Sequence, residues 1–156
     1  MKTLILGLGN DLIADDAIGP VVARRLVEPL REFADVTDTA VHGLALLDLM
    51  VGYERVILID AIVTGEAEPG TIMELEPDAF RAVEAPSPHY AGLPELMDLA
   101  RRLELPFPSE LIILAVEIHD AATIGGGMTP AVEAAIGPGC QRVIERVHGR
   151  AIEATS

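Results

Sequence analysis

The sequence has few aromatic residues and few basic ones. Three Phe, two Tyr and no Trp occur in 156 residues, and 11 Lys and Arg stand against 25 Asp and Glu, for a formal net charge of −14. Nucleic-acid-binding proteins present a basic surface to phosphates, and single-strand binders add aromatic side chains on which bases stack. Nucleic acid is therefore not an expected partner. An acidic surface instead favours cations or basic segments of another protein.

Cysteine and long apolar runs are also scarce. The single cysteine, Cys140, excludes an internal disulfide, is typical of a reducing compartment, and is interpreted as a packed side chain rather than a nucleophile. No apolar run approaches the roughly 18 residues of a membrane span. The short apolar stretch 3–6 runs into Gly7 without a small-residue cleavage site, so it predicts a strand rather than a signal peptide. We expect a cytoplasmic protein without membrane contact.

Segments with strand and helix patterns alternate along the chain. Short apolar runs predict strands at 3–8, 35–41, 55–60, 71–75 and 111–117, with 71–75 at the sheet edge. Helical spacing predicts helices from Gly19-Pro20, at 43–50, at 93–103 and after Thr129-Pro130, the last interrupted by Gly137-Pro138-Gly139 and continuing to His148. The alternation predicts a mostly parallel sheet with helices on both faces. No linker or repeat occurs, so residues 1–156 are expected to form one domain.

Acidic residues follow two predicted strands at the end where open α/β sheets bind ligands. Asp15 and Asp16 come after the first strand, and Asp60 ends the strand 55–60. Two adjacent acids before a helix are explained by the helix dipole alone, but the preceding Gly7-x-Gly9-Asn10 indicates a loop built for close approach. A carboxylate such as Asp60 at the end of an aliphatic strand either caps a turn or binds a partner, often a cation.

Two histidines are candidates to join these acids. His89 follows the stiff segment Pro86-Ser87-Pro88, and His119 follows the strand 111–117; the residue pattern alone does not choose between them. Two carboxylates and one imidazole suit a borderline divalent metal such as nickel or zinc. The His-Glu-x-x-His helix, the Gly-x-Ser-x-Gly elbow and a Cys–His pair are all missing from the sequence.

Dinucleotide binding is another possible function, and the loop after the first predicted strand argues against it. Gly7 and Gly9 match the start of the dinucleotide fingerprint, but Leu12 occupies the position of its third glycine. Asp15 and Asp16 would in addition repel a pyrophosphate at the helix N-terminus.

Four motifs, in order along nearly the whole chain, resemble those of the hydrogenase maturation proteases, the endopeptidases that trim the large subunit of nickel–iron hydrogenases. They are Gly7-x-Gly9-Asn10-x-Leu12-x-x-Asp15-Asp16-x-x-Gly19-Pro20; Gly52-Tyr53-Glu54-Arg55-Val56-Ile57-Leu58-Ile59-Asp60-Ala61 with Glu68-Pro69-Gly70-Thr71; Ser87-Pro88-His89-x-x-Gly92-Leu93-x-x-Leu96; and Gly127-Met128-Thr129-Pro130-x-Val132. The resemblance implies a single three-layer α/β/α domain of the phosphorylase/hydrolase-like type, with a five-stranded, mostly parallel twisted sheet.

The resemblance also implies a substrate and a site. The substrate would be a nickel-loaded large-subunit precursor that loses a C-terminal extension, and the nickel, for which other divalent metals could substitute, would arrive with it. Asp16, Asp60 and His89 would bind that metal, with Asp16 and Asp60 also catalytic. Residues expected to bind substrate are Gly9, Asn10, Asp15 and Asp38. Whether the metal only guides recognition or also activates water, and whether Asp15, Asp16 or Asp60 acts as general base, stays open.

The sequence departs from the family pattern in three places. Ala17 stands where a Gly usually follows the paired acids, Asp38-Thr39-Ala40-Val41-His42-Gly43 replaces an Asp-Gly-Gly-Thr-like loop, and Glu117-Ile118-His119-Asp120 replaces an acid–Pro pair. The rival function is a non-catalytic nickel- or partner-binding maturation module on the same fold. A monomer is expected, because a helix-covered sheet has few exposed edges and the net charge is repulsive.

Overall fold

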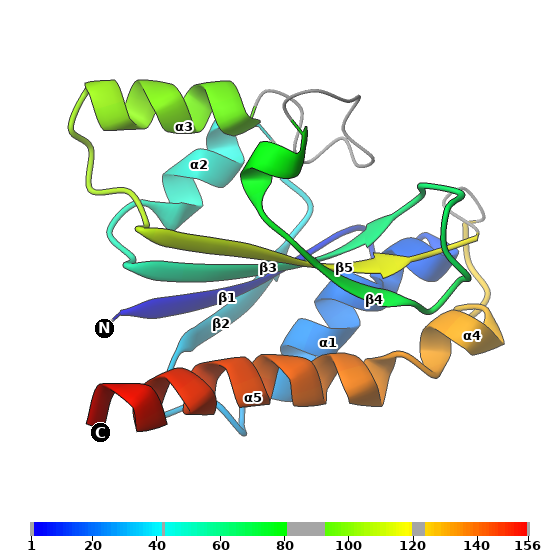
Figure 1. The fold of residues 1–156 in the computed structure, drawn as a ribbon. Coiled ribbons are helices and arrows are strands. Elements are labelled where there is room, and N and C mark those ends of the chain that lie inside the picture. The colour runs from blue at the N-terminus through cyan, green and yellow to red at the C-terminus, as the bar shows by residue number, and fades with distance from the viewer. Residues whose placement is uncertain (1, 42, 81–92, 120–123, 156) are drawn as a thin grey trace.

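The computed structural model describes residues 2–41, 43–80, 93–119 and 124–155 (Figure 1). Its centre is a sheet of five strands in the order β2-β1-β3-β5-β4. Four of these strands run parallel to one another: β1 (Thr3–Leu8), β2 (Asp35–Thr39), β3 (Arg55–Ile62) and β5 (Glu110–Glu117). The fifth strand, β4 (Ile72–Leu75), pairs antiparallel with β5 at one edge of the sheet. This confirms the five-stranded, mostly parallel sheet with residues 72–75 at its edge.

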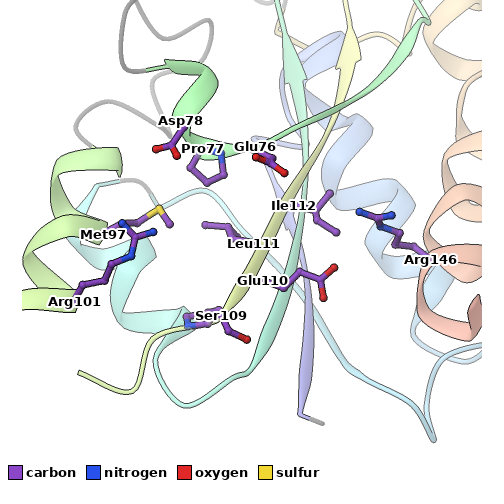
Figure 2. A pocket seen from close by; sticks show the side chains of 11 residues that line it. Glu76, Pro77, Asp78, Met97, Arg101, Ser109, Glu110, Leu111, Ile112 and Arg146 are labelled. Atoms are coloured by element: carbon purple, nitrogen blue, oxygen red, sulfur yellow. The ribbon is translucent and has the colours of Figure 1, made fainter. Parts of the chain in front are cut away.

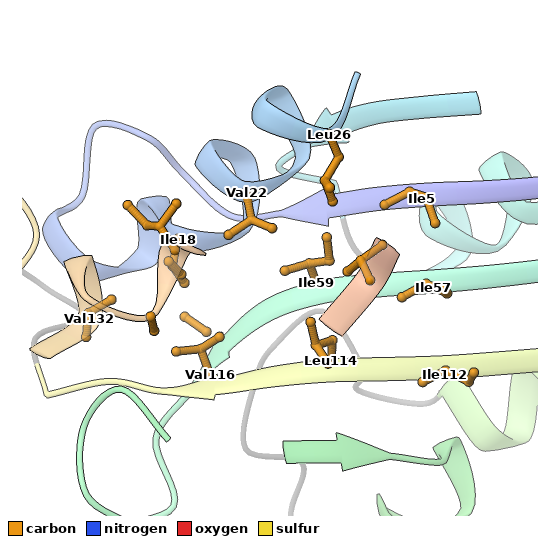
Figure 3. Packing of buried hydrophobic residues seen from close by; sticks show 14 of the residues in the cluster. Ile5, Ile18, Val22, Leu26, Ile57, Ile59, Ile112, Leu114, Val116 and Val132 are labelled. Carbon is orange, nitrogen blue, oxygen red and sulfur yellow. The ribbon is translucent and has the colours of Figure 1, made fainter. Parts of the chain in front are cut away.

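Helices cover both faces of the sheet and make three layers. α1 (Ile18–Leu26) and α5 (Ile136–Thr155) lie on one face, and α2 (Leu44–Met50) and α3 (Leu93–Arg102) lie on the other (Figure 1). β1, β3 and β5 are almost entirely buried, which explains why they are continuous aliphatic runs. Successive side chains enter opposite layers, so Ile57 and Ile59 pack on the face of α1 (Figure 3). Leu58 packs on the face of α2 and α3.

The helix boundary near the C-terminus differs from the prediction. The first helix of this region, α4 (Pro130–Glu133), ends before Ala134, and α5 begins at Ile136, so Gly137-Pro138-Gly139 lies within the first turn of α5. The predicted interruption occurs, but it lies earlier, at Ala134 and Ala135. Pro138 stands in the first turn of α5, where a helix needs no backbone N–H donor from it, so the predicted restart of the helix near Pro138 is confirmed. α5 also continues past His148 to Thr155. None of the described helices combines the length and apolar character of a membrane span.

Two glycines let α1 lie directly against the sheet backbone. A Cβ atom at Gly19 would come within 2.5 Å of the carbonyl oxygen of Ile59 in β3, and closer still to that of Leu8 in β1. A Cβ at Gly7 would collide with the carbonyl of Gly19 and lie 2.7 Å from the Cβ of Ala23. The Gly-x-Gly and Gly-Pro elements of the first motif therefore bring the start of α1 against the carboxyl ends of two neighbouring strands.

Candidate functional site

Asp16 lies in a tight loop at the carboxyl end of β1. The chain leaves β1 through Gly9, whose φ of 145° is a conformation that residues with a side chain rarely adopt. A Cβ atom at Gly9 would also collide with the backbone carbonyl of Asp16. It then forms the 3₁₀ turn η1 (Ala14–Ala17), which leads into α1. Gly9 thus allows the loop to fold back over its own start, and this conformation sets the position of Asp16.

The carboxylate of Asp16 is half-buried and held on one side only. Its Oδ2 accepts a hydrogen bond of 2.7 Å from the backbone N–H of Asn10, whereas Oδ1 accepts none within the described part of the chain. The side chain of Asn10 in turn accepts a hydrogen bond of 2.9 Å from the N–H of Leu12, an Asx turn that stabilises the loop. Asp16 is therefore an oriented carboxylate with one oxygen open to a ligand.

Asp60 lies at the same end of the sheet as Asp16, near the carboxyl end of the central strand β3. β3 continues two residues beyond the predicted end, so Asp60 pairs with Ala115 of β5 rather than ending the strand. It is fully buried on the face covered by α2 and α3, and its Oδ1 accepts a hydrogen bond of 2.8 Å from the N–H of Ala61. Because a buried charge is costly without partners, Asp60 is a specialised position rather than a surface turn.

The structure brings Asp16 and Asp60 to the same end of the sheet, the end at which the parallel strands finish. η1 packs against β3, and Gly19 contacts the carbonyl that precedes Asp60. His89 lies outside the described residues, while its rival His119 is exposed just after β5. Among the residues that are described, no group of three or more His, Cys, Asp or Glu is arranged to hold a metal. The Asp16–Asp60–His89 set therefore stays a prediction.

Asp15, unlike Asp16, points into the protein. It has no exposed surface, and its Oδ1 accepts hydrogen bonds of 2.7 Å from the N–H and 3.0 Å from the hydroxyl of Thr129. Thr129 is the residue before α4, so Asp15 joins the loop after β1 to the start of that helix. This arrangement favours a structural role over the predicted contact with substrate. No local pattern points to this partner, because Thr129 lies 114 residues away along the chain.

Asp38, also predicted to bind substrate, forms an ion pair at the end of β2. Its two carboxylate oxygens accept hydrogen bonds of 3.1 and 3.2 Å from the guanidinium of Arg24 in α1, which also contacts Asp11 at 2.8 Å. The hydrogen bonds to Asp38 and then to Asp11 raise the pKa of Arg24 above its ordinary value. The three side chains link α1, β2 and the loop that carries Asp16.

A third buried acid, Glu117, holds the loop after β3. Its carboxylate accepts hydrogen bonds from the hydroxyl of Thr64 and, at 2.9 Å, from the backbone N–H of Thr64. Neither Glu117 nor Thr64 is among the site residues predicted from the sequence. The only sign of this pair in the sequence is that Glu117 ends one buried strand and Thr64 follows the neighbouring strand.

A cavity of about 250 Å³ lies at the opposite end of the sheet, beside the start of β5. Charged side chains line it, among them Glu76 just after β4, Arg101 of α3 and Arg146 of α5 (Figure 2). Ligands of open α/β sheets bind at the carboxyl ends of the strands, and this cavity is at the amino end. It is therefore separate from the site that contains Asp16 and Asp60.

The fold and the position of these acids define an α/β protein with a candidate ligand site at the carboxyl ends of its parallel strands. Residues 21–146 match the family model described as hydrogenase maturation protease. The hydrogenase 2 maturation protease of Escherichia coli is 33% identical over 99% of this chain and 95% of its own length. The chain belongs to the hydrogenase maturation protease family, which confirms the resemblance of the four motifs and the endopeptidase class.

Solved structures agree with this assignment. The hydrogenase maturating endopeptidase HybD from E. coli superposes with a TM-score of 0.77, at 32% identity over 96% of this chain and 94% of that chain. The [NiFe] hydrogenase maturation protease HybD from Thermococcus kodakarensis has a TM-score of 0.73, at 25% identity over 94% of this chain and 99% of that chain. Both confirm the three-layer α/β architecture expected from the sequence.

Proposed function

We propose that this protein removes the C-terminal extension of a nickel-loaded [NiFe]-hydrogenase large-subunit precursor, and that it recognises the nickel carried by that substrate through Asp16, Asp60 and His89. The E. coli relative is named for maturation of hydrogenase 2, and the T. kodakarensis relative for a [NiFe] hydrogenase. These names support a hydrogenase precursor as the substrate of this chain.

The main support for a metal-reading site is the carboxylate of Asp16. One of its oxygens is fixed by the N–H of Asn10, and within the described chain the other accepts no hydrogen bond. A carboxylate oxygen held in place in this way loses little freedom when it binds a cation, so the binding geometry is largely set in advance. The formal charge of −14 adds a favourable long-range potential for a cation.

Peptide hydrolysis requires a group that takes a proton from the attacking water and gives it to the leaving amine. Two carboxylates at one edge allow one to bind metal while the other receives that proton. Asp16 is half-buried and reaches solvent, whereas Asp60 is fully buried and acts from inside the sheet edge. The substrate's nickel, once bound, supplies positive charge that polarises the scissile carbonyl and fixes the cleavage register.

The test compares nickel-loaded and nickel-free precursor of a hydrogenase encoded in the same genome. We expect mass spectrometry to show loss of a C-terminal peptide from the loaded form only. Asp16→Asn, Asp60→Asn and His89→Ala should abolish cleavage, while Asp48→Asn, an exposed acid on α2, should cleave as the wild type does. Circular dichroism would check that each variant is folded.

Two outcomes would overturn this proposal. A folded wild-type protein that leaves the loaded precursor at full length is not its protease, and stable binding without a change in mass would identify a non-catalytic maturation module instead. Cleavage by Asp16→Asn at the wild-type rate would remove Asp16 from the site. Calorimetry with nickel alone does not separate the two functions, because both predict binding.

A further inference from the structure

Three loops at the carboxyl edge of the sheet each expose a large aliphatic side chain. Leu12 follows β1, Val63 follows β3 and Ile124 follows β5, with exposed fractions of 68%, 51% and 81%. Single exposed aliphatic residues are common on soluble proteins and need no explanation. These three, which we call the apolar rim, are instead gathered on the loops that surround one candidate site.

The backbones beneath Leu12 and Ile124 are bonded to each other. The N–H of Gly125 donates to the carbonyl of Leu12 at 2.9 Å, and Ile13 forms an antiparallel bridge with Ile124. The Gly125–Leu12 hydrogen bond flanks this bridge, so Ile13 and Ile124 are a non-hydrogen-bonded pair, the type whose side chains lie closest together. Because β3 lies between β1 and β5, the two loops meet beyond its end.

Val63 is held between two fixed backbone positions. The carbonyl of Ile62 accepts a hydrogen bond of 2.9 Å from the N–H of Ile118, and the N–H of Thr64 donates to Glu117 at 2.9 Å. The backbone on each side of Val63 is thus bonded, while the side chain is half exposed. All three rim residues are therefore aliphatic groups presented on bonded backbone, which lowers the entropy lost when they bind a partner.

We propose that the apolar rim binds aliphatic side chains of the substrate polypeptide on either side of its scissile bond, and so contributes to the choice of substrate. This inference rests on the proposed function. Leu12 lies four residues from Asp16 in the same loop, so a peptide bound at Asp16 lies close to the part of the rim that Leu12 forms. A second copy of this chain is a poor occupant, because two copies with a charge of −14 each repel one another.

The test measures KM and kcat for cleavage of nickel-loaded precursor. Leu12→Ala and Ile124→Ala should each raise KM about tenfold with little change in kcat, since each removes apolar contact area made in the bound complex. Leu12→Met should stay close to wild type. Leu103→Ala is the matched control: Leu103 is 61% exposed but precedes β5, at the opposite end of the sheet.

Substitutions in the substrate identify the partner of the rim. The mass of the wild-type product locates the scissile bond, and the aliphatic residues that flank it are then changed to Ser in the precursor. Each change should raise KM about tenfold for the wild type, and by much less for Leu12→Ala or Ile124→Ala, because the contact is already lost.

Four results would overturn the inference. In the first, the wild type cleaves the precursor but Leu12→Ala and Ile124→Ala have the same kinetics as Leu103→Ala. In the second, the effects of the enzyme and substrate changes on KM are fully additive. In both cases the rim does not bind the flanking residues, and the proposed function stands. A wild-type dimer that Leu12→Ala dissociates would assign the rim to a second copy. A wild type without cleavage overturns the proposed function and this inference together.

Discussion

Replacement of Gly19 by Ala is expected to lower the free energy of unfolding by at least about 2 kcal/mol. A Cβ at this position would lie 2.5 Å from the carbonyl oxygen of Ile59, and real Cβ atoms essentially never come closer than 3.0 Å to another heavy atom. The obstacles are backbone carbonyls of two buried strands, so α1 has to move away from the sheet. Overpacking of this kind costs about 3 kcal/mol, and the better helix propensity of Ala returns about 1 kcal/mol.

The chain contains a matched control for this substitution. Ile136-Gly137-Pro138 repeats the tripeptide Ile18-Gly19-Pro20 at the same positions of the first turn of α5, and a Cβ at Gly137 would meet nothing within 4 Å. Gly137→Ala should therefore raise stability by about 0.5 kcal/mol through the reduced freedom of the unfolded chain.

Thermal and urea denaturation would measure both variants. The loss at Gly19 corresponds to a fall in Tm of about 4–8 °C for a chain of this length. Gly19→Ala should also cleave precursor more slowly than Gly137→Ala, because the start of α1 sets the position of Asp16. Equal stability of the two variants would refute the argument that α1 contacts the sheet backbone here.

Three further outcomes are expected. Asp15→Ala should lower the free energy of unfolding by about 2–4 kcal/mol in urea denaturation, because it leaves the part-buried N–H and hydroxyl of Thr129 without their acceptor, whereas Thr129→Val should cost about 1 kcal/mol; similar losses would contradict this. Burial raises the pKa of the Cys140 thiol, so iodoacetamide should alkylate it more slowly at pH 8 than free cysteine and about tenfold faster per pH unit up to pH 9; mass spectrometry measures the rate, and a rate equal to that of free cysteine would be inconsistent. Arg24→Gln should lower the urea midpoint only slightly in dilute buffer and by nothing measurable in about 0.5 M NaCl, because its ion pairs are solvent-exposed; a large, salt-independent fall of the midpoint would count against this expectation.

Most of the fold follows from local patterns in the sequence. Continuous aliphatic runs such as Val56-Ile57-Leu58-Ile59 have no polar face, so they predict strands covered on both sides, and their alternation with helices predicts the parallel order. The interruption of the helix was placed at Gly137-Pro138-Gly139 because Gly and Pro are common both at the end of one helix and at the start of the next. Which occurs depends on packing, and Gly139 lies against Val22 of α1, a contact that no local pattern reveals.

The candidate site was predictable only in part. Strand ends select Asp60 and the pair Asp15 and Asp16, because ligands bind where parallel strands finish, and the family resemblance then singled out Asp16. The two adjacent acids look equivalent in sequence, yet Asp15 is buried against Thr129 while Asp16 reaches solvent. Their difference depends on residues more than a hundred positions away, so sequence spacing carries no information about it. The choice of His89 over His119 came from family resemblance and stays a prediction.

The bonds from Asp15 to Thr129 and from Leu12 to Gly125 also have a consequence for biosynthesis. The loop that carries Asp16 leaves the ribosome early, but the residues that fix it are made more than a hundred positions later. At about 5–20 residues per second, that delay is on the order of ten seconds. Contacts with such a large sequence separation form late in folding, so we expect the loop to stay unformed on nascent chains that end before residue 124.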